Sequence, residues 1–193
     1  MTRGETNKQK QMQKDTVISK ILLTLMVFGI ILWLGGAIIR ISTAYDIYMP
    51  FTRLELKTEY NDAMRMHTVK LFTYGSLYTG AGFVMAFIGF FSLAYYWRDE
   101  FKGKGWMFIA LVLFIMASSW GIYELILDIR LSYLIKAGGA AFDNKLIGEL
   151  FVHRLSTLAP WSSIAYMSAI SSMLIMIWRP LNRIKKKNTG EKR

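Results

Sequence analysis

The chain contains no cysteine, which excludes disulfide frameworks, thiol redox relays and thiolate metal sites. Only three of its 193 residues are proline, and 13 acidic residues stand against 24 lysines and arginines. It also lacks a glycine-rich phosphate loop and the His-Glu-x-x-His and Gly-x-Ser-x-Gly motifs. These absences remove common signatures of nucleotide binding and hydrolysis, and they favour a role without catalysis.

Apolar residues are abundant and gather in four long runs. They make up 53% of the chain, and each run is long enough to cross the ~30 Å hydrocarbon core of a bilayer. The runs cover residues 18–39, 69–97, 106–127 and 158–178. Because only a helix satisfies its own backbone hydrogen bonds in lipid, we expect an all-α integral membrane protein with four transmembrane helices.

The distribution of lysine and arginine predicts the orientation. Residues 1–20, the short connection 98–104 and residues 179–193 hold 15 of the 24 cations. By the positive-inside rule, these parts face the cytoplasm. We therefore expect a multi-pass protein of the inner (cytoplasmic) cell membrane, whose transmembrane domain 17–178 lies between basic cytoplasmic tails at 1–16 and 179–193.

The helices are predicted to extend beyond the outer leaflet. An apolar stripe continues through residues 40–50 and again through 127–138, up to a proline and a glycine pair. Residues 52–67 and 143–154 are amphipathic and predict helical lead-ins to the next spans, with Asp143 as an N-cap. The predicted architecture is two long helical hairpins joined by a tight inner connection.

The two halves of the chain share a few residues at similar spacing. Trp33 and Trp120 lie 87 positions apart, and the only histidines, His67 and His153, lie 86 apart. A tandem two-helix repeat, related by an axis along the membrane normal, is one explanation. The other is a chance coincidence among four membrane helices of ordinary composition.

His67 and His153 are predicted on the outer side, each just before the second helix of its hairpin. If the halves are related by symmetry, the two imidazoles face each other and suit axial ligation of haem b, or a copper site. Both positions fall at the outer headgroups, where a haem would be exposed. The alternative is two interfacial histidines with no ligand role and no bound cofactor.

A cluster of charges is predicted at the outer ends of the first and third spans, comprising Arg40, Glu124, Asp128 and Arg130. Glu124 and Asp128 are four residues apart and share a helix face, whereas Arg130 points elsewhere. Ionisable groups at membrane depth normally pair, so we expect Arg40 to pair with one carboxylate. The cluster is interpreted either as a substrate or proton site in an outer vestibule, or as side chains that snorkel or lock two helices together.

Small residues four apart recur in the second and fourth spans. Such pairs let helix backbones approach closely and let hydroxyl groups bond across the contact. The pairs are Gly82 with Ala86, Ala165 with Ala169, and Ser168 with Ser172. They predict helix packing, against a helix of this chain or of another.

The basic tails, including residues 185–187, predict attraction to anionic lipid of the inner leaflet rather than to nucleic acid.

Three functions remain open. The preferred one is a non-catalytic four-helix subunit or assembly factor of a larger membrane protein complex. The alternatives are a small oligomeric transporter or channel unit that uses the outer charges, and a haem- or copper-bearing electron-transfer subunit that uses the two histidines.

Overall fold

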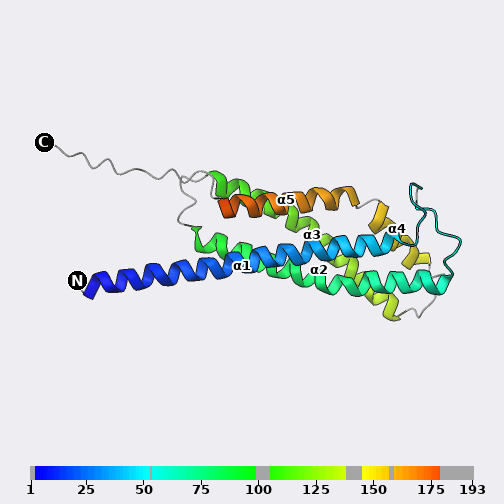
Figure 1. Cartoon of the computed structure of the whole chain (residues 1–193), viewed down its shortest axis with the longest axis horizontal. Coiled ribbons are helices and arrows are strands. Elements are labelled where there is room, and N and C mark those ends of the chain that lie inside the picture. The colour runs from blue at the N-terminus through cyan, green and yellow to red at the C-terminus, as the bar shows by residue number, and fades with distance from the viewer. Residues whose placement is uncertain (1–2, 53, 99–104, 138–144, 157–158, 179–193) are drawn as a thin grey trace.

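The computed structural model describes residues 3–52, 54–98, 105–137, 145–156 and 159–178, with side chains of the first helix described from Val17 onward. The described residues form five helices, and they contain one isolated antiparallel β-bridge, between Tyr48 and Leu56, but no strand. The helices lie roughly along one long axis (Figure 1). They are α1 (Arg3–Tyr45), α2 (Asp62–Tyr96), α3 (Gly105–Ala137), α4 (Lys145–Ser156) and α5 (Ala159–Trp178).

Four segments of these helices are long and apolar enough to cross a membrane: Val17–Tyr45 of α1, and the whole of α2, α3 and α5. This confirms the predicted all-helical chain with four apolar spans of a multi-pass membrane protein. Three of the helices are longer than the apolar runs alone, and α1 already begins at Arg3. Residues 3–16, assigned above to a tail, are therefore continuous with the first helix.

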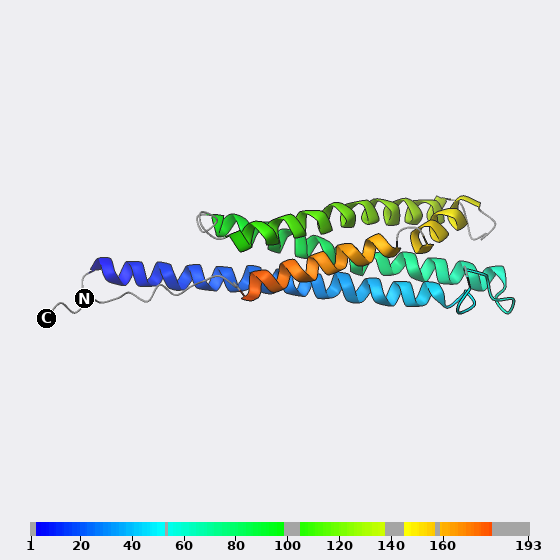
Figure 2. The same ribbon diagram turned by 90° about the horizontal axis from the view of Figure 1, so that it is seen from above.

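Helices α1 and α2 lie side by side for much of their length (Figures 1 and 2), and glycines set their close approach. A Cβ atom built on Gly29 would lie 2.3 Å from the backbone nitrogen of Ala86. One built on Gly82 would lie 2.5 Å from the backbone nitrogen of Trp33. Since a side chain fits at neither position, these glycines allow the two backbones to touch.

Helix α5 packs on α3 through the small residues that the sequence indicated. Ala165, Ala169 and Ser172 are buried, and the Ser172 hydroxyl donates a hydrogen bond of 2.7 Å to the backbone oxygen of Ala110 on α3. Ser168 is only half-buried, and its hydroxyl donates to Ile164 within α5. Of the pair Ser168 and Ser172, one hydroxyl therefore bonds within α5 and the other bonds to α3.

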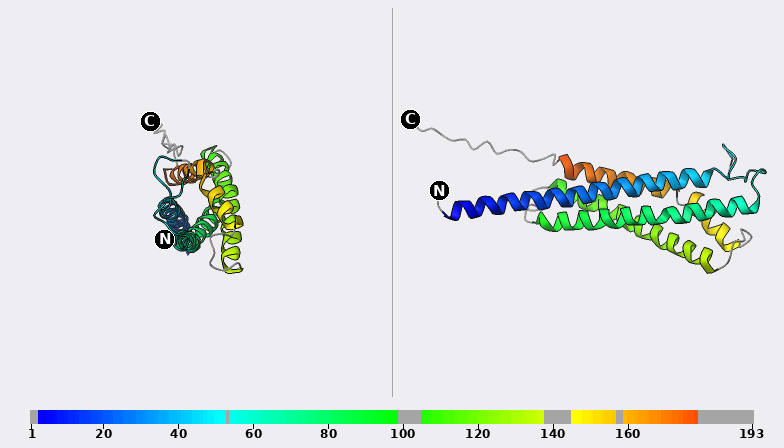
Figure 3. Two further views of the ribbon diagram at one scale, coloured as in Figure 1. Left: turned by 90° about the vertical axis from the view of Figure 1, so that its right-hand side faces the viewer. Right: turned by 60° about the horizontal axis from the view of Figure 1, so that its bottom comes forward.

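The bundle has two main apolar cores. The first contains residues of α1, α2, α3 and α5, with Phe90 stacked on Phe114 at a centroid distance of 3.9 Å. The second lies at the end of the bundle that carries α4, where Phe151 of α4 meets Phe72 of α2 edge to face at 5.3 Å. Figure 3 shows α3 leaning away from α2 toward its C-terminal end.

The predicted helical lead-in over 52–67 is wrong before Asp62. Asn61 caps α2, because its side-chain oxygen accepts a hydrogen bond of 2.9 Å from the backbone nitrogen of Met64. Phe51 and Leu54 have φ angles of 63° and 61°, in the left-handed region that interrupts a helix. Apolar residues of this loop, such as Leu54 and Leu56, pack on the second core without a helix.

The predicted lead-in over 143–154 is helical from Lys145, where α4 begins. Asp143, the proposed N-cap, lies outside the described residues, as do the glycine pair at 138–139 and the tail at 179–193. Helix α4 buries Ile147, Phe151 and Leu155 against the second core. Its position brings a further charged residue, Arg154, into the bundle.

Candidate functional site: a buried charge network

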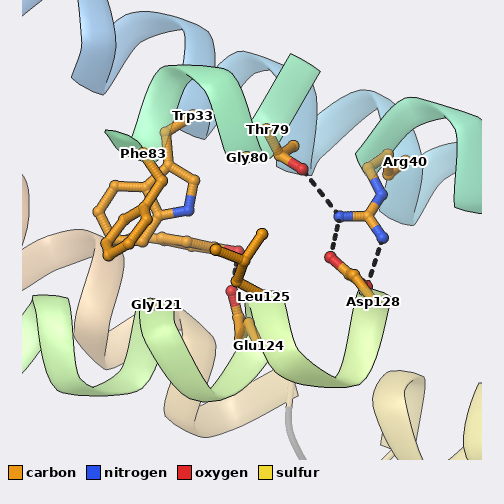
Figure 4. A pocket seen from close by; sticks show the side chains of 10 residues that line it. Trp33, Arg40, Thr79, Gly80, Phe83, Gly121, Glu124, Leu125 and Asp128 are labelled. Carbon is orange, nitrogen blue, oxygen red and sulfur yellow. Dashed lines mark hydrogen bonds and ion pairs between the residues drawn. The ribbon is translucent and has the colours of Figure 1, made fainter. Parts of the chain in front are cut away.

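Between the apolar cores lies a group of four buried charged side chains, which together with the polar side chains bonded to them is here called the charge network. Arg40 of α1 is 5% exposed, Glu124 and Asp128 of α3 are 4% and 5% exposed, and Arg154 of α4 is 9% exposed. Figure 4 shows Arg40 and the two carboxylates beside the small cavity that they line. Burial of this extent requires each charge to be paired.

Arg40 and Asp128 form a two-bond ion pair. Nη1 of Arg40 donates to Oδ2 of Asp128 at 2.8 Å, and Nη2 donates to Oδ1 at 2.7 Å (Figure 4). This parallel geometry is the strongest that a guanidinium and a carboxylate adopt. It joins α1 directly to α3.

The rest of the Arg40 guanidinium is bonded to α2. Nε donates to the backbone oxygen of Phe72 at 2.9 Å, and Nη1 also donates to the Thr79 hydroxyl at 3.0 Å. The cation lies 4.1 Å from the centroid of the Phe72 ring. A Cβ atom on Gly75 would lie 2.7 Å from Cγ of Arg40, so a glycine there leaves room for the arginine stem.

Arg154 forms the second ion pair. Its Nη1 lies 2.7 Å from Oε1 of Glu124, and its Nε lies 3.8 Å from Oδ1 of Asp128. Burial by itself lowers the pKa of Arg154, but the charges of Glu124 and Asp128 outweigh it and raise that pKa above its ordinary value. The guanidinium therefore stays charged and links α4 to α3.

Two residues of α5 complete the bonding of Glu124. The Ser162 hydroxyl donates to Oε1, and the Tyr166 hydroxyl donates to Oε2 at 3.0 Å. The Ser162 oxygen also accepts bonds from Nε1 of Trp120 at 3.2 Å and from Nη1 of Arg154 at 3.3 Å. Ser162 thus uses its one donor and two acceptor positions, all within the charge network.

The charge network is electrically neutral and largely closed. It contains two guanidinium groups and two carboxylates, with groups from all five helices. The two cavities that border Arg40 each have a volume of about 10 Å³, which is close to the space of one water molecule. The arrangement suits the fixing of helices against one another better than the binding of a solute inside the bundle.

The structure brings together three of the four residues of the predicted outer cluster, namely Arg40, Glu124 and Asp128. Arg40 pairs with Asp128, not with Glu124. Arg130 is exposed and takes no part in the network. The three network members are buried, so they do not snorkel to the surface. Their contacts link helices to one another, which is the arrangement that the helix-locking interpretation describes.

Sequence reasoning did not single out Arg154, Tyr166 or Thr79. A signal for Arg154 was present, since it falls on the apolar stripe of α4 that also contains Ile147 and Phe151. A cation on the buried face of an amphipathic helix needs a partner. That partner is Glu124, the carboxylate with which Arg40 does not pair.

The two histidines lie apart from this network. His67 is exposed on α2 and borders a depression of about 950 Å³ on the surface, together with Asp46, Tyr60 and Met64. His153 is exposed on α4 and does not line that depression. Within the described ranges, no three side chains from His, Asp and Glu gather as a metal-binding group.

Comparisons of the chain with protein-family models, with curated proteins and with solved structures find no match. Function is therefore inferred from the chemistry of the charge network and of the surfaces around it.

Proposed function

We propose that this chain is a non-catalytic integral membrane subunit, or an assembly factor, of a larger membrane protein complex. The observation that carries the proposal is the neutral charge network, in which side chains of all five helices bond to one another. Breaking one buried pair leaves an uncompensated charge and costs about 3–5 kcal/mol. Such a network favours one fixed arrangement of helices, which is what a partner protein needs for a stable contact.

The small size of the adjoining cavities also favours a structural role. A transporter exposes its binding site alternately to the two sides and usually holds the substrate near the middle of the membrane. Here the carboxylates are fully engaged by Arg40, Arg154, Ser162 and Tyr166. A solute would have to displace these bonds in order to reach either acid.

The orientation is part of the same proposal. The excess of lysine and arginine at both ends of the chain and in 98–104 supports cytoplasmic termini in an inner membrane. Packing of α1 on α2 and of α3 on α5 supports a two-hairpin arrangement. A tandem repeat is compatible with that packing, although α4 is a separate short helix before α5, whereas α2 is one helix throughout.

A transporter or channel unit is the second candidate, favoured by one observation. Asp128 lines the small internal cavity and also borders a wide groove between α2 and α3. A carboxylate at the junction of an internal cavity and an open groove is a suitable place for a cation or proton to enter. In that case, Asp128→Asn abolishes flux in proteoliposomes while Arg130→Gln leaves flux unchanged.

Purification of the intact chain from its native membranes in a mild detergent tests the proposal. We expect one or more other membrane proteins to co-purify at a fixed ratio. The Arg40→Ala variant should lose these partners, and Arg130→Ala, which changes an exposed arginine on α3, should retain them. A monomer or homo-oligomer without partners contradicts the proposal, and a haem absorption band would instead favour the electron-transfer alternative at His67 and His153.

A further inference from the structure

A groove of about 660 Å³ lies between α2 and α3, where the two helices diverge (Figure 3). Its walls are mainly apolar. They include Leu77, Val84 and Met85 of α2 and Leu125, Ile129 and Ile135 of α3. A space of this volume and lining is typical of a ligand site rather than of a packing defect.

One end of the groove carries two cations. Lys70 lies near the start of α2 and Lys136 near the end of α3, and both line the groove. Because the two helices run in opposite directions, these positions fall at the same end of the bundle. Among the described residues, neither lysine forms an ion pair within the chain.

The length of the groove matches one leaflet of a bilayer. At 1.5 Å per residue, Lys70 and Met85 are about 22 Å apart along α2, and Leu125 and Lys136 are about 16 Å apart along α3. One leaflet is about 15 Å of hydrocarbon and about 20–22 Å with its headgroup region. An apolar channel one leaflet deep, with positive charge at its outer end, has the shape of a site for a lipid tail with an anionic headgroup.

We propose that an anionic phospholipid binds in this groove, with its phosphate between Lys70 and Lys136 and an acyl chain along the apolar walls. Basic side chains near the ends of membrane helices attract anionic headgroups in this way. Asp128, the acid on the wall, is already paired with Arg40, so the groove has a net positive charge. That charge selects an anionic over a zwitterionic lipid.

A transmembrane helix of another protein is the competing occupant. The two lysines favour the lipid, because an apolar helix offers no anion to the end of the groove that they line. The small side chain of Ala81, which is exposed and lines the groove, leaves space for a flexible chain. Asp128 is the one member of the charge network that borders the groove, and lipid binding there does not depend on the proposed function.

Binding of two lipids to the purified chain in detergent, measured by native mass spectrometry, tests the headgroup preference. The probes are phosphatidylglycerol and phosphatidylcholine with identical acyl chains. We expect phosphatidylglycerol to bind at least about tenfold more tightly. The double variant Lys70→Gln/Lys136→Gln should lose this preference, whereas Lys20→Gln/Arg130→Gln, which removes the same charge from exposed positions outside the groove, should keep it.

A second pair of variants tests the position of the acyl chain. Ala81→Trp fills the groove and should weaken the binding of both lipids, while Ile88→Trp, at an exposed position of α2 outside the groove, should not. The proposal is overturned if the lysine double variant keeps the preference for phosphatidylglycerol or if the two tryptophan variants bind lipid equally. It is also overturned if Ala81→Cys cross-links to another protein in native membranes, because a helix then occupies the groove.

Discussion

Arg154 of α4 and Glu124 of α3 form a buried ion pair with 2.7 Å between Nη1 and Oε1. The pair ties α4, a helix of only 12 residues, to the apolar helix α3. Through Ser162 the same carboxylate also holds α5. One acidic side chain therefore connects the three helices α3, α4 and α5.

Ser162 should matter more than its neighbour Ser163. Replacement of Ser162 by alanine removes one donor from Glu124 and one acceptor from Arg154, which keep their mutual ion pair, and it removes the acceptor of the Trp120 indole N–H. We expect a loss of about 1–3 kcal/mol in the free energy of unfolding in detergent. Ser163→Ala removes only a bond within α5 from an exposed side chain and should change stability little. Equal effects of the two changes would contradict the described bonding.

The α1–α2 contact predicts that alanine has different effects on stability at two glycine positions of these helices. At Gly82 a methyl group would collide with the backbone of Trp33, so Gly82→Ala should lower the melting temperature in detergent. At Gly35 nothing lies within 4 Å of the new atom. Gly35→Ala should be neutral or stabilising by up to about 1 kcal/mol, because alanine favours the helix. A neutral Gly82→Ala change would show that the two backbones are not in contact.

The loop before α2 provides a pH-dependent contact. Tyr60 donates a hydrogen bond of 2.6 Å to Asp46, and this bond, with the nearby charge of Lys57, lowers the pKa of Asp46 below its ordinary value of 3.8. A lowered folded-state pKa adds stability above 3.8, and that contribution is lost as the pH falls through the folded-state pKa. Tyr60→Phe should raise the pKa of Asp46, measured from its carboxyl carbon shift by NMR. The exposed Tyr74→Phe is the control, and no difference between the two variants would refute the contact.

The absence of cysteine makes the orientation easy to test. Single cysteines at two exposed positions, Asn61→Cys and Gly105→Cys, lie near opposite ends of the bundle. If the termini are cytoplasmic, an impermeant thiol reagent applied to intact cells should label only the cysteine at position 61. Labelling at 105 but not at 61 would reverse the proposed orientation.

The apolar spans could be predicted because composition and length alone decide whether a segment suits a bilayer. The loop before α2 could not, because Leu54 and Leu56 follow a helix-like pattern while Asn61 provides a strong cap that starts the helix later. The local bond to the cap and the packing of the loop outweigh the periodicity there.

The charge network was predictable only in part. Pairing of Arg40 with an acid follows from the cost of an isolated buried charge. The choice of Asp128 depends on how α3 is rotated and on Arg154, which occupies Glu124. These are tertiary relationships between distant segments, and no spacing along the chain encodes them. The α2–α3 groove has the same origin, since it results from the divergence of two helices.

A double-mutant cycle on Arg40 and Asp128, measured as the free energy of unfolding in detergent, tests whether this buried ion pair holds α1 against α3. Arg40→Ala should cost about 3–5 kcal/mol, because the Asp128 carboxylate is left buried without its cation. Adding Asp128→Asn should restore part of that loss. Adding Glu124→Gln instead should restore nothing, because Glu124 is paired with Arg154. Single effects that add to within about 0.5 kcal/mol in the Arg40 and Asp128 cycle would show that the two side chains do not hold the helices together.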